Sequence, residues 1–213
     1  MKRVLPLLLL VLVMCQCNNS QPEQQNEPVK TAREQYPEKF TEGYIGERAL
    51  HLMELFSDCD GNDDLEYKPL FSERYYDLLK EANSLPKEFI TELAGAWLWV
   101  YYMEYNDPEQ TISEVNLLND STANVMMNGQ MGDYGVELLF VGDDWVINDM
   151  PVNSREQLSR IIQQEREWFK SLDFQKMMDE FEDDEVFTKE EYVAMVEWFK
   201  QEVDAYFAKY PDK

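Results

Sequence analysis

The central part of the chain, residues 111–150, reads TISEVNLLNDSTANVMMNGQMGDYGVELLFVGDDWVINDM. Apolar and polar residues alternate along most of it, and the alternation stops at Asn119-Asp120, Gly132-Asp133 and Gly142-Asp143-Asp144. A period of two is typical of a strand with one buried face. Asn, Asp and Gly favour tight turns because they adopt positive φ or bond to their own backbone. The pattern therefore predicts a meander of three or four antiparallel strands.

The strands have predicted limits. In the first, the even-numbered residues from Ile112 to Leu118 alternate with the odd-numbered residues from Thr111 to Leu117. The following strands are predicted at 123–131, at 134–141 and from Trp145 to Ile147, after the last turn.

Helices are predicted upstream of the strands. Apolar residues at helical spacing begin at Tyr44, in a helix that ends near Gly61, and a second helix covers 70–85. Residues 86–105 fit both structures. A row of residues spaced by four (Phe89, Leu93, Trp97 and Tyr101), with Pro86 before it, favours a helix, whereas the aromatic run 97–102 is typical of a strand.

Two helices are also predicted downstream of the strands. Ser154 with Gln157 and Thr188 with Glu191 are capping boxes, and each precedes apolar residues at helical spacing. An acidic linker at 182–185 joins the two segments. Two amphipathic helices with a short connector predict an antiparallel hairpin whose apolar faces must be buried.

The composition limits the class of partner. The chain has 213 residues, with 19 Lys and Arg against 43 Asp and Glu, and a formal net charge of -24. Nucleic-acid phosphates and anionic lipid surfaces are bound by concentrated Lys and Arg, so both are excluded as partners of the folded part. The length fits one domain, or one domain with an appendage, and the 44% apolar fraction suffices for a core.

The N-terminus has the features of a targeting segment. Lys2 and Arg3 precede an apolar run, Val4–Met14, which is shorter than the roughly 20 residues that a membrane span needs. Cys15 and Cys17 stand where the run ends. This arrangement resembles a bacterial lipoprotein signal, in which a cysteine just past the apolar run is acylated and becomes the new N-terminus.

The polar residues that follow it favour Cys17 as the acylated residue, with Cys15 as the alternative. Neither cysteine follows the small residue that such signals prefer, because Met14 and Gln16 precede them. A secreted protein with two incidental cysteines is the competing interpretation. Residues 1–16 are then the signal peptide, and residues 17–43 form a polar tether.

The order of helices and strands resembles the nuclear-transport-factor-2-like (cystatin-like) domain, particularly in lipoproteins of that superfamily. Those proteins commonly close their last hairpin with a turn, a Trp, an alternating apolar residue and an acidic end, as Trp145, Ile147 and Asp149 do here. The resemblance covers 44–150 and implies a curved sheet wrapped on helices around a cone-shaped pocket. Family enzymes use that pocket for isomerase or dehydratase chemistry, and other members use it for binding. Residues 151–213 extend beyond the family pattern.

Few residues suggest chemistry. The single histidine, His51, lies in the first predicted helix, where a surface histidine is more usual than a catalytic one. Cys59 is flanked by two aspartates, whose charge disfavours a thiolate. Residues 58–64 are rich in Asp, but no EF-hand register fits them, so a loose surface calcium site is the alternative to a solvated turn. We therefore predict no catalytic residue and no metal site.

The charge is unevenly placed. Between Lys87 and Arg155 there is no Lys or Arg, yet the span holds twelve Asp and Glu. Either the bases Arg155, Arg160, Arg166 and Lys170 fold back against the sheet, or its acidic residues face water. A solvated face is favoured over a dedicated site for a cation or basic partner.

The aromatic residues between the second helix and the strands suggest one further alternative. Trp97, Trp99, Tyr101, Tyr102 and Tyr105 lie close together in the sequence. Such a cluster is more often core than a surface on which sugars stack, because one helical face cannot present all five. A carbohydrate-binding protein would need Trp97 or Trp99 exposed.

Together these patterns predict an α+β fold: N-terminal helices packed on a curved antiparallel sheet of three or four strands (44–150), followed by a C-terminal helical hairpin (151–213). The predicted function is a lipid-anchored envelope protein, in the outer membrane of a diderm bacterium, that acts as a non-enzymatic binding or assembly module. The alternatives are an isomerase- or dehydratase-like enzyme with a carboxylate or His base, and a carbohydrate-binding surface lipoprotein. We expect no cofactor, membrane contact through the anchor only, and as partner a protein or a neutral or cationic small ligand.

Overall fold

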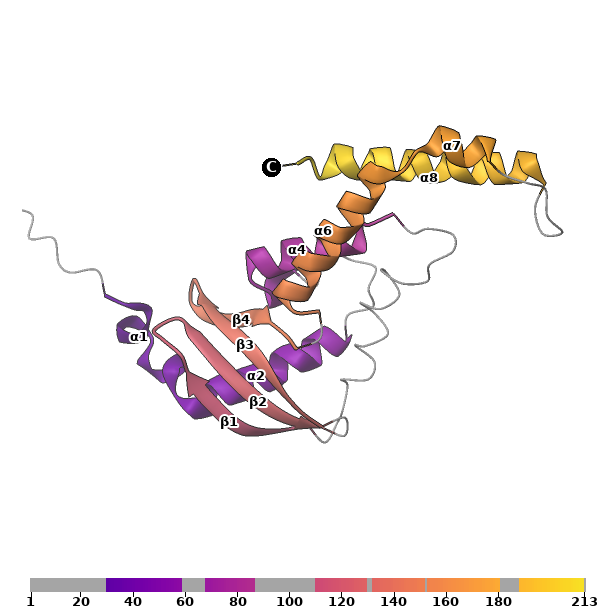
Figure 1. Cartoon of the computed structure of the whole chain (residues 1–213). Coiled ribbons are helices and arrows are strands. Elements are labelled where there is room, and N and C mark those ends of the chain that lie inside the picture. Colours follow the sequence, from indigo (N-terminus) through magenta and orange to yellow (C-terminus); the bar gives the residue numbers. More distant parts are fainter. Residues whose placement is uncertain are drawn as a thin grey trace, which may run out of the picture. The chain divides into compact units, whose positions relative to one another are not determined.

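The central strands form one antiparallel sheet in the computed structural model, which describes residues 30–58, 68–86, 110–129, 132–151, 153–180 and 188–212. The strands are β1 (Thr111–Leu117), β2 (Thr122–Gly129), β3 (Gly132–Val141) and β4 (Asp144–Asp149), and each is paired with the next (Figure 1). The α+β class and the meander are therefore confirmed, with four strands. Gly132 and Gly142 have φ of 106° and 67°, which favours glycine at both turns.

One face of the sheet contributes much of the core. The register of β2 and β3 places Val125 opposite Val136, and that of β3 and β4 places Phe140 opposite Trp145. Cross-strand pairs of β-branched and aromatic residues stabilise a sheet at such positions. The buried apolar residues of these strands are Ala123, Val125, Met127, Tyr134, Val136, Leu138, Phe140, Trp145 and Ile147.

The first strand differs from the predicted alternation. Its register with β2 shifts between Ile112 and Glu114, which makes Ser113 the extra residue of a β-bulge. Ile112, Val115 and Leu117 are consequently the half-buried residues, and they come from both of the predicted sets. The prediction is wrong here because one inserted residue exchanges the two faces of everything that follows it.

Helical structure begins before Tyr44, within the predicted tether. α1 (Ala32–Gln35) and the 3-10 turn η1 (Pro37–Phe40) precede α2 (Glu42–Asp58), and the residues Thr31–Lys213 form one unit. The ring of Phe40 is buried, with centroid distances of 4.8 Å to Phe140 and 5.0 Å to Trp145. These contacts with the sheet explain why residues 31–43 are folded although they lack a long periodic pattern.

The next elements lie beside the last strand. α2 contacts β1, β2 and β4, and η2 (Lys68–Leu70) leads into α4 (Glu73–Asn83), which is capped by Ser72. Phe71 forms a parallel bridge with Ile147, and the Ser72 amide donates to the Ile147 carbonyl at 2.8 Å. The outer edge of β4 is thereby occupied. The ambiguous segment 86–105 lies outside the described residues, apart from Pro86.

The C-terminal part is helical, as predicted, but in three pieces. α6 (Arg155–Ser171) and α8 (Lys189–Lys209) begin at the two predicted capping boxes, and the short α7 (Phe174–Asp179) was not predicted. The rings of Phe169 in α6 and Phe199 in α8 lie 6.1 Å apart. The linker 182–185 lies outside the described residues. Among the helices that are described, none combines the length and apolar character needed to cross a bilayer.

Candidate functional site

Bases from the flanking helices neutralise part of the acidic sheet. At the start of α6, Arg155 pairs with Glu137 of β3 at 2.8 Å and with Asp149 of β4 at 3.3 Å. From α2, Arg48 pairs with Asp144 at 3.2 Å. Arg155 was among the bases predicted to fold back, whereas Arg48 was not. These pairs tie helices to the sheet and leave its other acidic residues to solvent.

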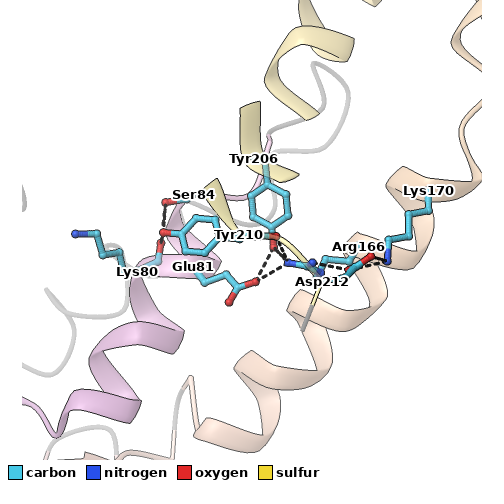
Figure 2. Close-up of polar contacts among 8 residues, drawn as sticks. All are labelled: Lys80, Glu81, Ser84, Arg166, Lys170, Tyr206, Tyr210 and Asp212. Atoms are coloured by element: carbon cyan, nitrogen blue, oxygen red, sulfur yellow. Dashed lines mark hydrogen bonds and ion pairs between the residues drawn. The ribbon is translucent and has the colours of Figure 1, made fainter. Parts of the chain in front are cut away.

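Two more of the predicted bases turn away from the sheet. Arg166 and Lys170, both in α6, belong to a polar cluster that joins α4, α6 and the end of α8 (Figure 2). We call it the Arg166 cluster. It consists of Lys80, Glu81, Ser84, Arg166, Lys170, Tyr206, Tyr210 and Asp212.

Arg166 lies at the centre of this cluster. Its guanidinium reaches Glu81 Oε1 at 3.0 Å, Asp212 Oδ1 at 2.6 Å and the Tyr210 carbonyl at 2.9 Å. The Tyr206 hydroxyl donates to the same Glu81 oxygen at 2.9 Å, and Lys170 reaches Asp212 at 2.6 Å. One base thus connects a helix before the sheet with two segments after it, and the contacts have the character of a structural tie.

The pKa shifts in the cluster follow from burial and charge. Burial raises the pKa of Tyr206, and the bond to Glu81 adds to this effect against the opposing bond from Arg166. The bonds from Lys170 and Arg166 lower the pKa of Asp212. Burial disfavours the charged form of Arg166, but its bonds to Asp212, Tyr206 and Glu81 outweigh burial and raise its pKa. The three shifts favour a neutral Tyr206, a negatively charged Asp212 and a positively charged Arg166.

A second feature is an open hollow between α2 and β1, which we call the α2–β1 groove. The volume of this hollow is about 570 Å³. Its lining residues are Glu42, Gly43, Gly46, Glu47 and Leu50 of α2, and Ile112, Ser113, Glu114, Val115 and Asn116 of β1.

The groove exists because α2 presents glycine where other helices present side chains. A Cβ at Gly46 would lie 3.5 Å from the Ile112 side chain and 3.6 Å from that of Val115, and one at Gly43 would meet nothing within 4 Å. Leu50, with these two β1 residues, supplies half-buried apolar surface. The sequence carried a signal for this hollow, two glycines three apart in a helix, which sequence analysis missed.

Three carboxylates surround the apolar surface of the groove. Glu42, Glu47 and Glu114 are exposed, and within the described ranges none of them forms an ion pair. An apolar surface with an acidic rim favours ligands that carry both apolar and cationic groups.

Most of the candidate residues that the sequence singled out lie outside the described part of the chain. His51 is exposed and pairs with Glu54 at 3.6 Å on the surface of α2, outside the groove lining. The candidate acylation residues Cys15 and Cys17, together with Cys59 and the aromatic cluster 97–105, lie outside the described residues. In the parts of the chain that are described, no three His, Cys, Asp or Glu residues are grouped as a metal site would need.

Comparison of the chain with protein-family models, with curated proteins and with solved structures gives no match. The resemblance to nuclear-transport-factor-2-like domains therefore rests on the sequence pattern alone. The α2–β1 groove and the Arg166 cluster are the two groupings of polar residues described above that could have a functional role. Of these, the groove is open to a ligand, whereas the cluster is filled by its own partners.

Proposed function

We propose that the protein is a lipid-anchored protein of the bacterial cell envelope that acts as a non-enzymatic binding or assembly module. The observation that carries this proposal is the α2–β1 groove, whose lining combines aliphatic side chains with exposed carboxylates. The arginines at the helix interfaces are engaged in structural ties.

The proposal includes the finer architecture. The helices before the sheet pack on a curved sheet of the nuclear-transport-factor-2-like kind, and the C-terminal helices form a hairpin held by the Arg166 cluster. The contacts of α2 with three strands and the ring contacts between α6 and α8 support this arrangement. In this arrangement the groove lies at one edge of the sheet, because β1 is an outer strand.

The anchor is tested by metabolic labelling with an alkyne fatty acid in a diderm bacterial host. We expect the wild-type chain to carry the label and to fractionate with the outer membrane, and Cys17→Ser to lose both properties. Cys15→Ser is the matched control, since it changes the neighbouring cysteine alone. Label on a Cys15→Ser/Cys17→Ser double variant, or no label on the wild type, would overturn the lipid anchor.

The binding role is tested in the same cells with a photo-crosslinking amino acid. We expect this amino acid, when it replaces Asn116 on the groove, to give discrete adducts. These adducts should disappear when Glu114 is changed to Lys. Placed at Glu202, on the exposed side of α8, it should give none of these adducts. Equal adducts at both positions, or none at Asn116, would count against a binding module that works through the groove.

A further inference from the structure

The two outer strands of the sheet differ in what covers them. β4 is bridged by Phe71, and its Ile147 carbonyl accepts a hydrogen bond from Ser72. β1 pairs with β2 on one side, and among the described residues no backbone group pairs with its other side. An edge strand directs alternate N–H and C=O groups away from its partner, where another extended chain can pair with them.

The α2–β1 groove runs along this outer edge of β1. Five consecutive residues of β1, from Ile112 to Asn116, line it. Successive side chains of a strand point to opposite faces, so consecutive residues share one side of a hollow only where that side includes the strand edge. A ligand in the groove therefore meets both the backbone of β1 and the apolar side chains beside it.

The charge around the edge selects among extended chains. Glu42 and Glu47 on one side and Glu114 on the other give the groove three carboxylates, and the described residues of its lining include no Lys or Arg. The whole chain carries -24, so a second copy of the same acidic edge is repelled.

From these observations we infer that the α2–β1 groove binds a cationic, extended protein segment with alternating Lys or Arg and aliphatic residues, which adds as a fifth strand beside β1. The backbone of β1 supplies hydrogen bonds, Leu50, Ile112 and Val115 receive the aliphatic side chains, and the three glutamates attract the basic ones. This inference rests on the proposed binding function and specifies the class of its partner.

The probe is an N-acetylated peptide of alternating lysine and valine carrying a fluorophore, titrated with the folded protein at low salt. We expect saturable binding that weakens about tenfold in Glu47→Lys/Glu114→Lys, because each reversal replaces an attraction by a repulsion. Glu197→Lys/Glu202→Lys, which makes the same charge change on the exposed side of α8, should bind within about twofold of wild type. Far-UV circular dichroism of each variant establishes that it is folded.

Two comparison peptides separate strand addition from charge attraction alone. A peptide of the same composition with its lysines and valines in separate blocks, and one alternating glutamate and valine, should both bind at least about tenfold more weakly. On binding the alternating lysine peptide, the amides of β1 should exchange with deuterium more slowly, and those of β4 should not change. Equal binding of the block peptide, or unchanged exchange in β1, would overturn strand addition.

Other occupants of the edge have their own signatures. Slow exchange of the outward β1 amides in the free protein would mean that another part of the chain or a second copy covers the edge, and sedimentation velocity distinguishes the two. Either result overturns the inference. Crosslinked adducts at Asn116 combined with failure of the lysine peptide would reject this partner class and retain the proposed binding function.

Discussion

Trp145 joins the N-terminal turn to the sheet through one side chain. It is fully buried, its indole N–H donates to the Lys39 carbonyl at 2.7 Å, and its ring packs against Phe40 and Phe140. The hydrogen bond satisfies a carbonyl of η1, and the ring fills the space between η1 and β3. This one residue thus attaches η1 to the sheet.

Trp145→Phe tests this role. We expect the free energy of unfolding to fall by about 2–4 kcal/mol, because the variant leaves the Lys39 carbonyl without its donor and creates a small cavity. Urea unfolding followed by circular dichroism measures the change. Trp198→Phe is the matched control, since Trp198 is 48% exposed, and it should change stability by less than about 0.5 kcal/mol. Similar losses in both variants would contradict the assignment.

Gly46 of α2 is a glycine whose position neither its backbone nor its neighbours require. Its φ is not positive, and a Cβ would make ordinary contacts with Ile112 and Val115. Gly46→Ala should therefore raise the free energy of unfolding by about 0.5–1 kcal/mol, because alanine favours the helix. Thermal unfolding checks this gain. A loss of stability would mean that β1 and α2 approach more closely than the contact distances indicate.

At the scale of elements, the Arg166 cluster holds three helices together. Glu81 of α4 receives both Arg166 of α6 and the Tyr206 hydroxyl of α8. Side chains from positions 85 and 125 residues apart in the sequence meet at this carboxylate. Such a junction makes the stability of the C-terminal helices depend on α4.

Tyr206→Phe tests the junction through its pH dependence. Burial and Glu81 raise the pKa of Tyr206 above its usual 10.0, so the unfolded chain loses this proton at a lower pH than the folded one. The stability of the wild type should therefore fall by up to about 1.4 kcal/mol per pH unit above about pH 10 through this group. The variant lacks this dependence. At neutral pH it should be less stable by about 1–2 kcal/mol, because Glu81 loses a donor.

The difference in the free energy of unfolding between the wild type and Tyr206→Phe should consequently shrink as the pH rises above 10. Urea unfolding at a series of pH values measures it, and the ionisation of all other tyrosines is common to both proteins. A constant difference across that range would contradict a raised pKa for Tyr206.

Elements defined by local patterns were predictable, and contacts between distant residues were not. The turns at Gly132 and Gly142 and the caps at Ser154 and Thr188 depend on neighbours within four positions, and the structure has all of them. α1 and η1 are too short to show a period. Arg48 and Arg166 could not be assigned partners, because one sequence does not say which carboxylate a distant base will meet.

The α2–β1 groove also combines features that the sequence predicted with contacts between distant residues that it could not predict. The sequence predicted acidic strands and a helix at residues 44–61, and from that pattern a solvated acidic face. It could not place Gly46 opposite Ile112, because the bulge at Ser113 determines which β1 residues turn toward α2. The hollow, its apolar surface and the strand edge beside it depend on that placement.

At the scale of the whole molecule, the net charge of -24 opposes compactness. Some of the acidic residues are paired with bases of other elements, at Arg48, Arg155 and Arg166. These pairs are partly buried, so salt screens them less than it screens repulsion between exposed carboxylates. Exposed pairs such as Lys200 with Asp204 contribute little to stability. Repulsion should therefore dominate the response of the folded protein to salt.

We expect the Tm to rise as NaCl is increased from about 0.01 M to about 0.3 M, where the Debye length shortens from about 30 Å to about 6 Å. Differential scanning calorimetry at neutral pH measures this rise. Choline chloride at equal ionic strength should give the same shift, because screening does not depend on the cation. Glu197→Gln/Glu202→Gln removes two exposed carboxylates from α8 and should show a smaller rise. A Tm that falls with salt would mean that the ion pairs, and not the repulsion, govern the stability of this acidic chain.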